Sequence, residues 1–350
     1  MHIDEFNYEL PESHIALRPA SPRSASRLLV ATSDRIRDSV AINLGDHLQA
    51  GDRLVVNNVR VLPAHIEGFR VRRNARAGEI NRARVSFTLD EVISGSTWRA
   101  MGRPLRRMKP GDLVEFSEDC TATIEGIWGQ FCALTFDTGS RTVSEFLERH
   151  GTPPIPPYIA TRRAVDPRDR TDYQTVFAQR DGAAAAPTAS LHFDEELLAR
   201  LRALGVEFTE VTLKVGSGTF APIRCKNIDE HEMHPEWGEV PARAAAEIND
   251  TCAEGGRIIP VGTTAMRLIE SAAASGGISP WEGSTGLYIR PGFEFRISSA
   301  LLTNFHLPGS SLLVLVAAFV GLPRMRDIYR HAVESHYRFL SYGDWSLLFP

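Results

Sequence analysis

The segment Arg257-Ile-Ile-Pro-Val-Gly-Thr-Thr-Ala265 decides the fold class of this chain. Its first half is an apolar run typical of a buried strand, and its second half is a glycine-threonine turn. A helical pattern follows over residues 265–274. A strand that passes through a tight turn into a helix is the unit from which parallel sheets are built. The segment therefore predicts an α/β fold.

Strands and helices are predicted to alternate in other parts of the chain as well. Further predicted elements are strands over residues 53–57 and 206–215, and helices over residues 193–204 and 241–254. Asp194 is placed to cap the first of these helices and Gly205 to end it. We expect residues 1–62 and 151–350 to form a mixed α/β, barrel-like catalytic body.

Residues 63–150 show a different pattern of apolar and polar residues. Short alternating segments, such as 83–87, 113–116 and 122–125, are separated by turns such as Lys109-Pro-Gly-Asp112. Alternation with a period of two and frequent turns predict an antiparallel β-structure. We expect an all-β barrel domain inserted into the body. The stretch Pro153-Pro-Ile-Pro-Pro157 cannot be a regular helix, so it predicts a stiff linker that leads back to the body.

Charge is unevenly distributed along the 350 residues. The net charge is −4, yet residues 60–110 hold 12 lysines and arginines against 4 acidic residues, a local charge of +8. The remainder therefore carries −12. A basic segment on an acidic body can hold a phosphate backbone. A solvated arginine-rich surface also explains the pattern, and without further information it is the favoured interpretation.

The sequence gives no strong sign of a metal or disulfide site. Cys120, Cys132, Cys225 and Cys252 are far apart and form no Cys/His cluster. His231-Glu-Met-His234 places its histidines at i and i+3 and is followed by Pro235, whereas zinc-binding HExxH needs i and i+4. We expect reduced thiols and no metal, with this segment suited to acid–base chemistry or hydrogen bonding.

We expect a cytoplasmic protein. No charged and apolar signal segment opens the chain. The longest apolar run, residues 312–320, is too short to cross a bilayer and predicts a buried helix.

Polar and glycine-rich segments lie between the predicted apolar elements, where chain reversals usually carry functional groups. The alanine run 183–186 allows a flat ligand to approach and leads to His192. The loop 214–220 can form a nest for an anion, and 260–267 brings free helix amides to a carboxylate or a ribose. The segment 303–308 sets Asn304 and His306 on a loop. Each has a structural alternative, such as a buried histidine or a capping threonine.

A series of short motifs runs along the chain: Leu10-Pro-x-x-x-Ile-Ala-x-Arg-Pro19, Ser26-Arg-Leu-Leu29, Pro156-Pro-Tyr-Ile159, Asp172-Tyr-Gln-Thr-Val176, Ala185-Ala-Pro-Thr-Ala189, Leu191-His-Phe193, Gly218-Thr-Phe220, His231-x-Met-His234, Val261-Gly-Thr-Thr264, Leu302-Thr-Asn-Phe-His-Leu-Pro308 and Tyr342-Gly-Asp344. In order and combination, these segments resemble the S-adenosylmethionine:tRNA ribosyltransferase-isomerases of queuosine synthesis. The resemblance covers essentially the whole chain.

The resemblance implies an α/β body with an inserted β-barrel and a two-substrate reaction. Members of the family transfer the ribosyl part of S-adenosylmethionine to the aminomethyl group of a 7-deazaguanine base at the tRNA wobble position. The ribose is rearranged to an epoxycyclopentane, and adenine and methionine leave. S-adenosylmethionine is then a co-substrate, no metal is needed, and the anticodon arm of tRNA is the partner. Both a monomer and a homodimer stay open.

The resemblance also assigns residues to roles. Candidates for proton transfer are His192, His234 and His306, with Asp344 or Glu232 to orient one of them. The candidates for binding S-adenosylmethionine are Ala186, Pro187, Thr188, Gly216, Gly218, Thr219, Thr263, Thr264, Arg267, Thr303 and Asn304. The candidates for binding the acceptor or RNA are Asn57, Asn58, Arg60, Arg103, Arg106, Arg107 and Lys214.

Several positions inside the motifs depart from the family pattern. Asn58 and Val59 replace aspartate and threonine, and Lys214 replaces histidine. The remaining departures are His65 for arginine, Ser190 for glycine, Pro235 for serine and Gly309 for a basic residue. The changes at 58 and 214 shift the local charge by about two units. They leave two alternatives open: a paralogue that uses S-adenosylmethionine on a small acceptor, and a catalytically silent RNA-binding protein.

Overall fold

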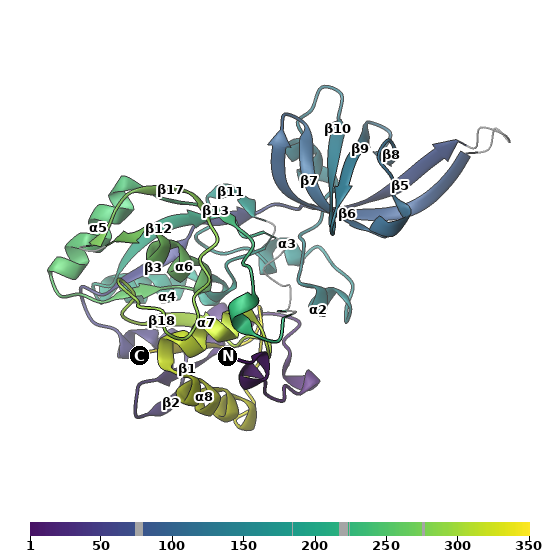
Figure 1. The fold of residues 1–350 in the computed structure, drawn as a ribbon. Helices are drawn as coiled ribbons and strands as arrows, with labels where there is room; N and C mark the ends of the chain where they lie inside the picture. Colours follow the sequence, from purple (N-terminus) through teal and green to yellow (C-terminus); the bar gives the residue numbers. More distant parts are fainter. Residues whose placement is uncertain (74–79, 184, 217–222, 224, 275–276) are drawn as a thin grey trace. The chain divides into compact units, whose positions relative to one another are not determined.

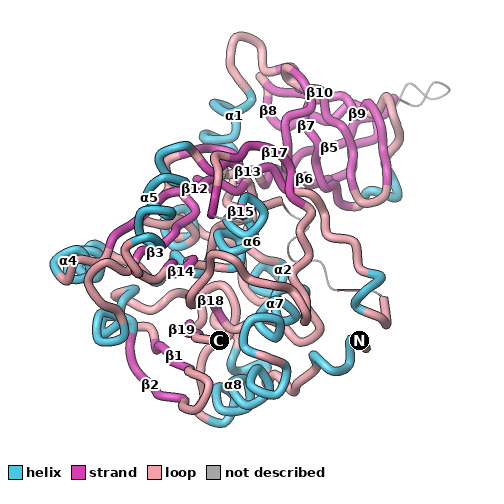
Figure 2. Tube along the Cα trace, turned by 60° about the vertical axis from the view of Figure 1, so that its left-hand side comes forward, coloured by secondary structure: helices cyan, strands magenta, loops and turns pink. Residues whose placement is uncertain are grey.

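The computed structural model describes residues 1–73, 80–183, 185–216, 223, 225–274 and 277–350. The chain divides into two compact units (Figure 1). Residues 1–59, 174–180 and 186–350 form the first unit, which we call the body. Residues 60–173 and 181–185 form the second, which we call the barrel unit. Figure 2 shows that strands dominate the barrel unit, whereas the body mixes helices with strands.

A closed antiparallel barrel with strand order β10-β7-β6-β5-β8-β9 is the centre of the barrel unit. Its strands are β5 (His65–Arg73), β6 (Ile80–Ser94), β7 (Thr97–Arg103), β8 (Leu113–Ser117), β9 (Cys120–Trp128) and β10 (Phe131–Asp137). Alternate residues point inward, as the burial of Val85, Phe87 and Leu89 along β6 shows. The apolar residues at every second position of the pattern therefore line the interior of the barrel.

Short helices accompany the barrel. They are η5 (Leu105–Arg107), α1 (Val143–His150), α2 (Pro157–Ala160) and α3 (Asp169–Asp172). The proline-rich stretch is not helical until its last residue, Pro157, which opens α2 because proline suits the first helical position. The barrel strands fall within the predicted insertion 63–150, while the compact unit continues to residue 173. The exact domain boundaries stay a prediction.

Two sheets form the frame of the body. The five-stranded sheet has the order β14-β3-β12-β13-β17. Its strands are β14 (Ile258–Pro260), β3 (Arg53–Asn57), β12 (Glu207–Leu213), β13 (Glu236–Val240) and β17 (Trp281–Thr285). β3 is parallel to both β12 and β14, whereas β13 is antiparallel to β12 and β17. The helices α5 (Ala242–Ala253) and α6 (Thr263–Ala272) share an apolar core with this sheet.

The four-stranded sheet has the order β18-β19-β1-β2. Its strands are β18 (Leu301–Asn304), β19 (Trp345–Leu348), β1 (Arg27–Ala31) and β2 (Ile36–Val40). A parallel bridge between Val261 and Leu302 joins it to the end of β14. A second apolar core, which includes Leu28, Leu54, Phe193 and Trp345, connects the two sheets with α4 (Glu195–Ala203).

The remaining elements are those of the other described residues. They are the strands β4 (Val59–Val61), β11 (Arg180–Ala183), β15 (Ala273–Ala274) and β16 (Gly277–Ile278), the helices α7 (Ser311–Val320) and α8 (Leu322–Glu334), and the 3-10 turns η1 (Ile3–Phe6), η2 (Glu12–His14), η3 (Arg23–Ala25), η4 (Ala41–His47), η6 (Thr188–His192) and η8 (Ile228–Glu230). Within the described ranges, no helix is both long and apolar enough to span a membrane.

The predicted mixed α/β body with an inserted all-β barrel is confirmed. Asp194 caps α4 as expected, since its side chain accepts a hydrogen bond from the amide of Leu197. The helix predicted over residues 265–274 begins earlier, at Thr263, because Gly262 with φ +93° lets the helix start directly after the turn. It also ends earlier, because Ala273 and Ala274 pair with residues 277 and 278.

Candidate functional site at the carboxyl edge of the body sheet

Parallel pairing brings distant motifs to one edge of the five-stranded sheet, which we call the carboxyl edge. Because β3, β12 and β14 are parallel, their carboxyl ends at Asn57, Leu213 and Pro260 lie on the same side. β13 runs antiparallel to β12, so its first residue, Glu236, also lies there. The bridge to Leu302 extends this edge to the end of β18. In open α/β sheets, ligands bind at this edge.

His192 is held at the centre of a buried hydrogen-bond network. The residue closes η6, and only 4% of it is exposed. Its Nδ1 lies 2.9 Å from Ser26 Oγ, and its Nε2 lies 3.0 Å from Asn304 Nδ2. Its ring stacks on Trp345, with centroids 4.6 Å apart and planes 21° apart. The imidazole is therefore fixed on both nitrogens and on one face.

The network fixes the protonation of His192 and the orientation of Asn304. Asn304 Oδ1 accepts a hydrogen bond from Thr188 Oγ1 at 3.0 Å, so its amide nitrogen must face His192 and the carbonyl of Leu340. Nε2 of the ring is then an acceptor, and Nδ1 carries the proton that Ser26 Oγ accepts. Burial, with the charges of Arg338 and Arg23 adding to it, lowers the pKa of His192 to about 3, which keeps the ring neutral.

His306 is held by its backbone as well as by its ring. Its Nε2 lies 2.9 Å from Thr303 Oγ1. Its amide donates to the hydroxyl of Tyr329 at 3.0 Å, and its carbonyl accepts from the hydroxyl of Tyr8. Burial lowers the pKa of His306 to about 3. Both His192 and His306 are therefore neutral, buried histidines and not groups poised near neutral pH.

His234 and Asp344 have contrasting surroundings. His234 is exposed on the loop two residues before Glu236. Asp344 is buried, and in the described part of the chain its oxygens accept from the amides of Arg27, at 3.0 Å, and Arg338, at 2.8 Å, and from the Arg338 guanidinium. These contacts include no histidine and instead tie the C-terminal segment to β1. The orienting role expected for Asp344 stays a prediction.

The start of α6 brings several of the predicted ligand-binding residues together. Thr263 and Thr264 form its first turn and are buried. Arg267 donates from Nη1 to Glu236 Oε2 at 2.6 Å and from Nε to the carbonyl of Leu287 at 3.1 Å. Glu236 also accepts from the amide of Gly216 at 3.0 Å. The pair Arg267–Glu236 is thus a fixed ion pair at the carboxyl edge.

The other predicted ligand-binding residues lie beside the histidine network or the start of α6, or outside the described residues. Ala186 and Pro187 are buried and lead directly into η6, which begins at Thr188. Thr303 contacts His306. Gly218 and Thr219 lie outside the described residues.

The candidates for acceptor binding in the body divide by burial. Asn57 is buried and clamps β3 to β12: its Nδ2 donates to the carbonyl of Leu213, and its Oδ1 accepts from the amide of Leu213. Asn58, 8% exposed, accepts from Thr212 Oγ1 at 2.8 Å and donates to Glu210 at 3.2 Å. Lys214 is exposed, with its Nζ 4.6 Å above the ring of Trp237. Only Lys214 of these three faces solvent.

Two classes of arginine can be distinguished in the barrel unit by their partners. Arg103, Arg106 and Arg107 are exposed, and among the described residues their side chains have no carboxylate partner. The paired class contains Arg60 with Asp181 and Glu148, Arg72 with Asp112, Arg82 with Glu115, Arg84 with Glu67, Arg99 with Asp90 and Glu91, Arg141 with Asp119, Arg163 with Asp169, and Arg170 with Glu148. Hydrogen bonding to Asp181 raises the pKa of Arg60. The unpaired class is the one free to meet phosphates.

Three contributors to the site were not predicted. Ser26 and Trp345 contact the ring of His192, and Glu236 holds Arg267. Each lies in or directly beside a recognised motif, since Ser26 opens Ser26-Arg-Leu-Leu29, Trp345 follows Asp344, and Glu236 ends the His231–Glu236 segment. Their positions in or beside the motifs are a signal that could have found them. Only the folded structure shows which residues they contact.

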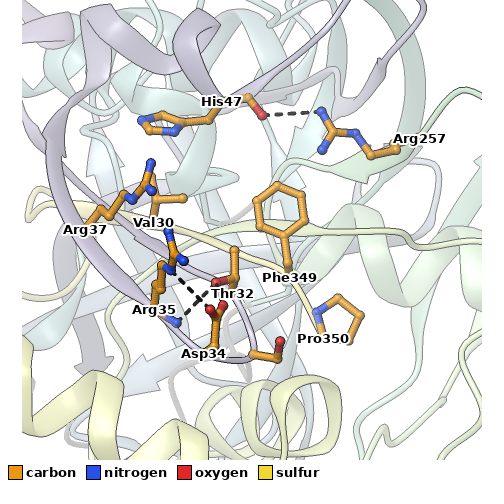
Figure 3. A pocket seen from close by; sticks show the side chains of 10 residues that line it. Val30, Thr32, Asp34, Arg35, Arg37, His47, Arg257, Phe349 and Pro350 are labelled. Atoms are coloured by element: carbon orange, nitrogen blue, oxygen red, sulfur yellow. Dashed lines mark hydrogen bonds and ion pairs between the residues drawn. The ribbon is translucent and has the colours of Figure 1, made fainter.

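Two surface pockets lie at the opposite edge of the body. One, of about 530 Å³, lies beside Arg37, His47, Arg257 and Phe349 (Figure 3). The other, of about 470 Å³, is lined by Arg53 and Glu207 among others. Arg53 and Glu207 begin β3 and β12, and Arg257 directly precedes β14, so both pockets lie at the amino ends of these strands. Among the described residues, neither is lined by a predicted site residue.

Comparison with known proteins identifies the family. The family model described as "Queuosine biosynthesis protein" matches residues 3–348. The chain belongs to the queuosine biosynthesis protein family. The resemblance inferred from the motifs is thus confirmed.

No group of three or more histidine, cysteine, aspartate or glutamate side chains suited to hold a metal occurs within the described ranges.

Individual members of the family match over the full length. The S-adenosylmethionine:tRNA ribosyltransferase-isomerase of Ruegeria pomeroyi is 53% identical over 350 residues and covers 100% of both chains. The protein of the same name from Cereibacter sphaeroides is also 53% identical, over 100% of this chain and 99% of its own. The crystal structure of the S-adenosylmethionine tRNA ribosyltransferase from Thermotoga maritima is similar, with a TM-score of 0.55, 32% identity, and 98% and 99% of the two chains covered.

Proposed function

We propose that this chain is an S-adenosylmethionine:tRNA ribosyltransferase-isomerase. It transfers and rearranges the ribosyl moiety of S-adenosylmethionine onto 7-aminomethyl-7-deazaguanine at the tRNA wobble position. Epoxyqueuosine-tRNA forms, and adenine and methionine are released. S-adenosylmethionine is a substrate in this reaction, and the anticodon arm of tRNA is the partner. A tRNA substrate also favours a cytoplasmic location.

One structural observation carries the proposal. The carboxyl edge gathers His192, Asn304, the first turn of α6 and the Arg267–Glu236 pair, although these groups come from segments far apart in the sequence. They are the segments in which the chain resembles its family. The full-length relatives at 53% identity carry the activity in their names and support the same conclusion.

The surroundings of the three histidines suggest different roles for them. The reaction needs a base to remove a proton beside the positively charged sulfur, where the carbon is unusually acidic. A base must be accessible, and His234 is the exposed member of the three. His192 and His306 are neutral and hydrogen-bonded, so they suit positioning. We assign proton removal to His234 and the orientation of the Asn304 amide to His192.

The unpaired arginines of the barrel unit are the proposed contacts to the tRNA backbone. Arg106 and Arg107 belong to η5, and Arg103 ends β7 shortly before it. The carbonyl of Arg107 accepts hydrogen bonds from Arg70 and Arg72 on β5, so this cationic turn is anchored to the barrel. Anchored cations lose less conformational freedom when they bind a phosphate.

A second candidate keeps S-adenosylmethionine but replaces the tRNA with a small anionic acceptor. Lys214 favours it, because this exposed ammonium stands at the carboxyl edge where the family has histidine. A lysine can hold an anionic group as a point charge.

Adenine release distinguishes the candidates. The purified protein is incubated with S-adenosylmethionine, with and without tRNA that carries the 7-aminomethyl-7-deazaguanine base. Adenine release that requires this tRNA supports the first proposal. Release without RNA supports the small-acceptor enzyme, and no turnover would leave only the silent RNA-binding protein.

A further inference from the structure

Two buried polar atoms at the start of α6 have no hydrogen-bond partner among the described residues. They are Thr264 Oγ1 and Arg267 Nη2, and the two residues are 9% and 4% exposed. Thr264 and Arg267 are three positions apart in α6, so their side chains share one face of the helix. Buried polar groups in folded proteins are almost always paired, so two orphans on one face need an explanation.

The Arg267 guanidinium is fixed in place by its other nitrogens. Nη1 donates to Glu236 Oε2 and Nε to the carbonyl of Leu287. Both partners lie at the carboxyl edge, because Glu236 begins β13 and Leu287 follows the end of β17. A long helical side chain also lies over the turn that precedes its own Cα, which here is the first turn of α6. The two N–H groups of Nη2 are thus held at this turn, with no acceptor in the described part of the chain.

The first turn of α6 offers further donors. The turn begins at Gly262, and no side chain from the described ranges caps the helix. The amide of Gly262 donates to the carbonyl of Leu302 at 2.7 Å, which leaves the amides of the helical residues after it for another acceptor. The positive end of the helix dipole adds to their attraction for an anion. Backbone, hydroxyl and guanidinium donors without acceptors therefore belong to the first five residues of one helix.

We propose that the first turn of α6, with Thr264 and Arg267, binds the carboxylate of the methionine part of S-adenosylmethionine. This inference rests on the proposed function. Glu236 already balances the single positive charge of Arg267, so a singly charged carboxylate suits the site better than a phosphate dianion. The carboxylate accepts hydrogen bonds from all three kinds of donor.

The position of this subsite agrees with the rest of the candidate site. A Cβ placed on Gly262 would lie 3.4 Å from the Cβ of Ala189 and 3.6 Å from Thr264 Oγ1. η6, which contains Ala189 and His192, therefore passes directly beside the first turn of α6. A carboxylate bound at the turn leaves the sulfonium and ribose of the same molecule to extend along η6 towards Asn304.

Calorimetry with two ligands tests the carboxylate subsite. S-adenosylmethionine and 5′-methylthioadenosine share the nucleoside and the sulfur, but only the first has the carboxylate. Thr264→Val removes one hydroxyl at constant shape. The double variant Arg267→Met/Glu236→Gln removes both charges together, because Arg267→Met alone would leave a buried carboxylate unpaired. Arg200→Ala, which removes an exposed arginine from α4, is the control.

We expect each of the two site variants to bind S-adenosylmethionine at least about tenfold more weakly than the wild type. Affinity for 5′-methylthioadenosine should stay unchanged, and the control should bind both ligands normally. Unchanged affinity for S-adenosylmethionine in both site variants would overturn the subsite and leave the proposed function intact. An equal loss for both ligands would also overturn it, because the residues would then shape the nucleoside pocket. A wild-type protein that binds no S-adenosylmethionine would refute the subsite and the proposed function together.

Discussion

Asn304 Nδ2 donates to His192 Nε2 at 3.0 Å across 112 positions of sequence. The same amide group donates to the carbonyl of Leu340, and its oxygen accepts from Thr188 Oγ1. One side chain thus joins η6, β18 and the C-terminal segment at the carboxyl edge. The geometry depends on a donor and an acceptor at fixed ends of the amide, which only asparagine or glutamine provides.

Asn304→Asp should therefore disrupt the site without changing its size. The carboxylate cannot donate to the carbonyl of Leu340, which would lose a buried partner, and His192 would keep its contact only if its proton moved from Nδ1 to Nε2. We expect a loss of about 1–3 kcal/mol in the free energy of unfolding and a strong loss of adenine release. Urea denaturation and the tRNA-dependent assay measure the two effects. Wild-type stability in this variant would mean that the amide orientation does not matter.

The buried histidines predict an acid-sensitive fold. The pKa values of His192 and His306 are lowered to about 3 by burial, whereas unfolding restores values near 6.5. Between these values the unfolded state binds more protons, so stability is lost as pH falls from about 6.5 towards 3. Each histidine contributes up to about 1.4 kcal/mol per pH unit within this window.

Unfolding midpoints in urea between pH 7 and pH 4 test this prediction. His192→Gln should remove the contribution of one proton from the pH slope. Ser26→Ala, the control, removes a hydrogen bond but keeps the titrating ring, so it should lower stability and retain the slope. A slope that is the same in His192→Gln and in the wild type would contradict the assignment.

Asn58 illustrates a departure from the family pattern that the structure explains locally. Its amide donates to Glu210 and accepts from Thr212 Oγ1. Asn58→Asp would place a second carboxylate at hydrogen-bond distance from Glu210, which disfavours the charged forms of both. We expect a loss of about 1–3 kcal/mol at neutral pH. Adding Glu210→Gln should recover most of it, and a double-mutant cycle by urea denaturation measures the coupling.

Much of the fold could be predicted from the sequence, because its signals are local. Alternating residues mark the barrel strands, β3 was predicted over the same five residues that it occupies, and Asp194 marks the start of α4. The site depends on long-range contacts instead. Ser26 lies 166 positions from His192, and nothing in either local pattern indicates that they touch.

The protonation states of the site histidines could not be predicted from the local sequence either. A histidine in a polar motif suggests a base with a pKa near neutrality, but burial decides the outcome for His192 and His306. The same holds for the arginines of the barrel unit. Composition gives the local charge of +8 for residues 60–110, and only the folded barrel separates the paired cations from the unpaired ones.

The difference between paired and unpaired arginines gives a specific prediction about tRNA binding. The triple variant Arg103→Ala/Arg106→Ala/Arg107→Ala removes the unpaired cations, and Arg82→Ala/Arg84→Ala/Arg99→Ala removes the same charge from the paired class. If the unpaired arginines bind phosphates, only the first variant should bind tRNA more weakly. Its logarithmic salt slope should fall by roughly 0.7–0.9 for each phosphate that the protein no longer neutralises, or about two to three in total. The paired arginines are already neutralised by carboxylates, so their removal should leave the slope nearly unchanged. Filter binding over a range of salt concentrations measures both slopes, and equal slopes for the two variants would exclude Arg103, Arg106 and Arg107 as the phosphate-binding residues.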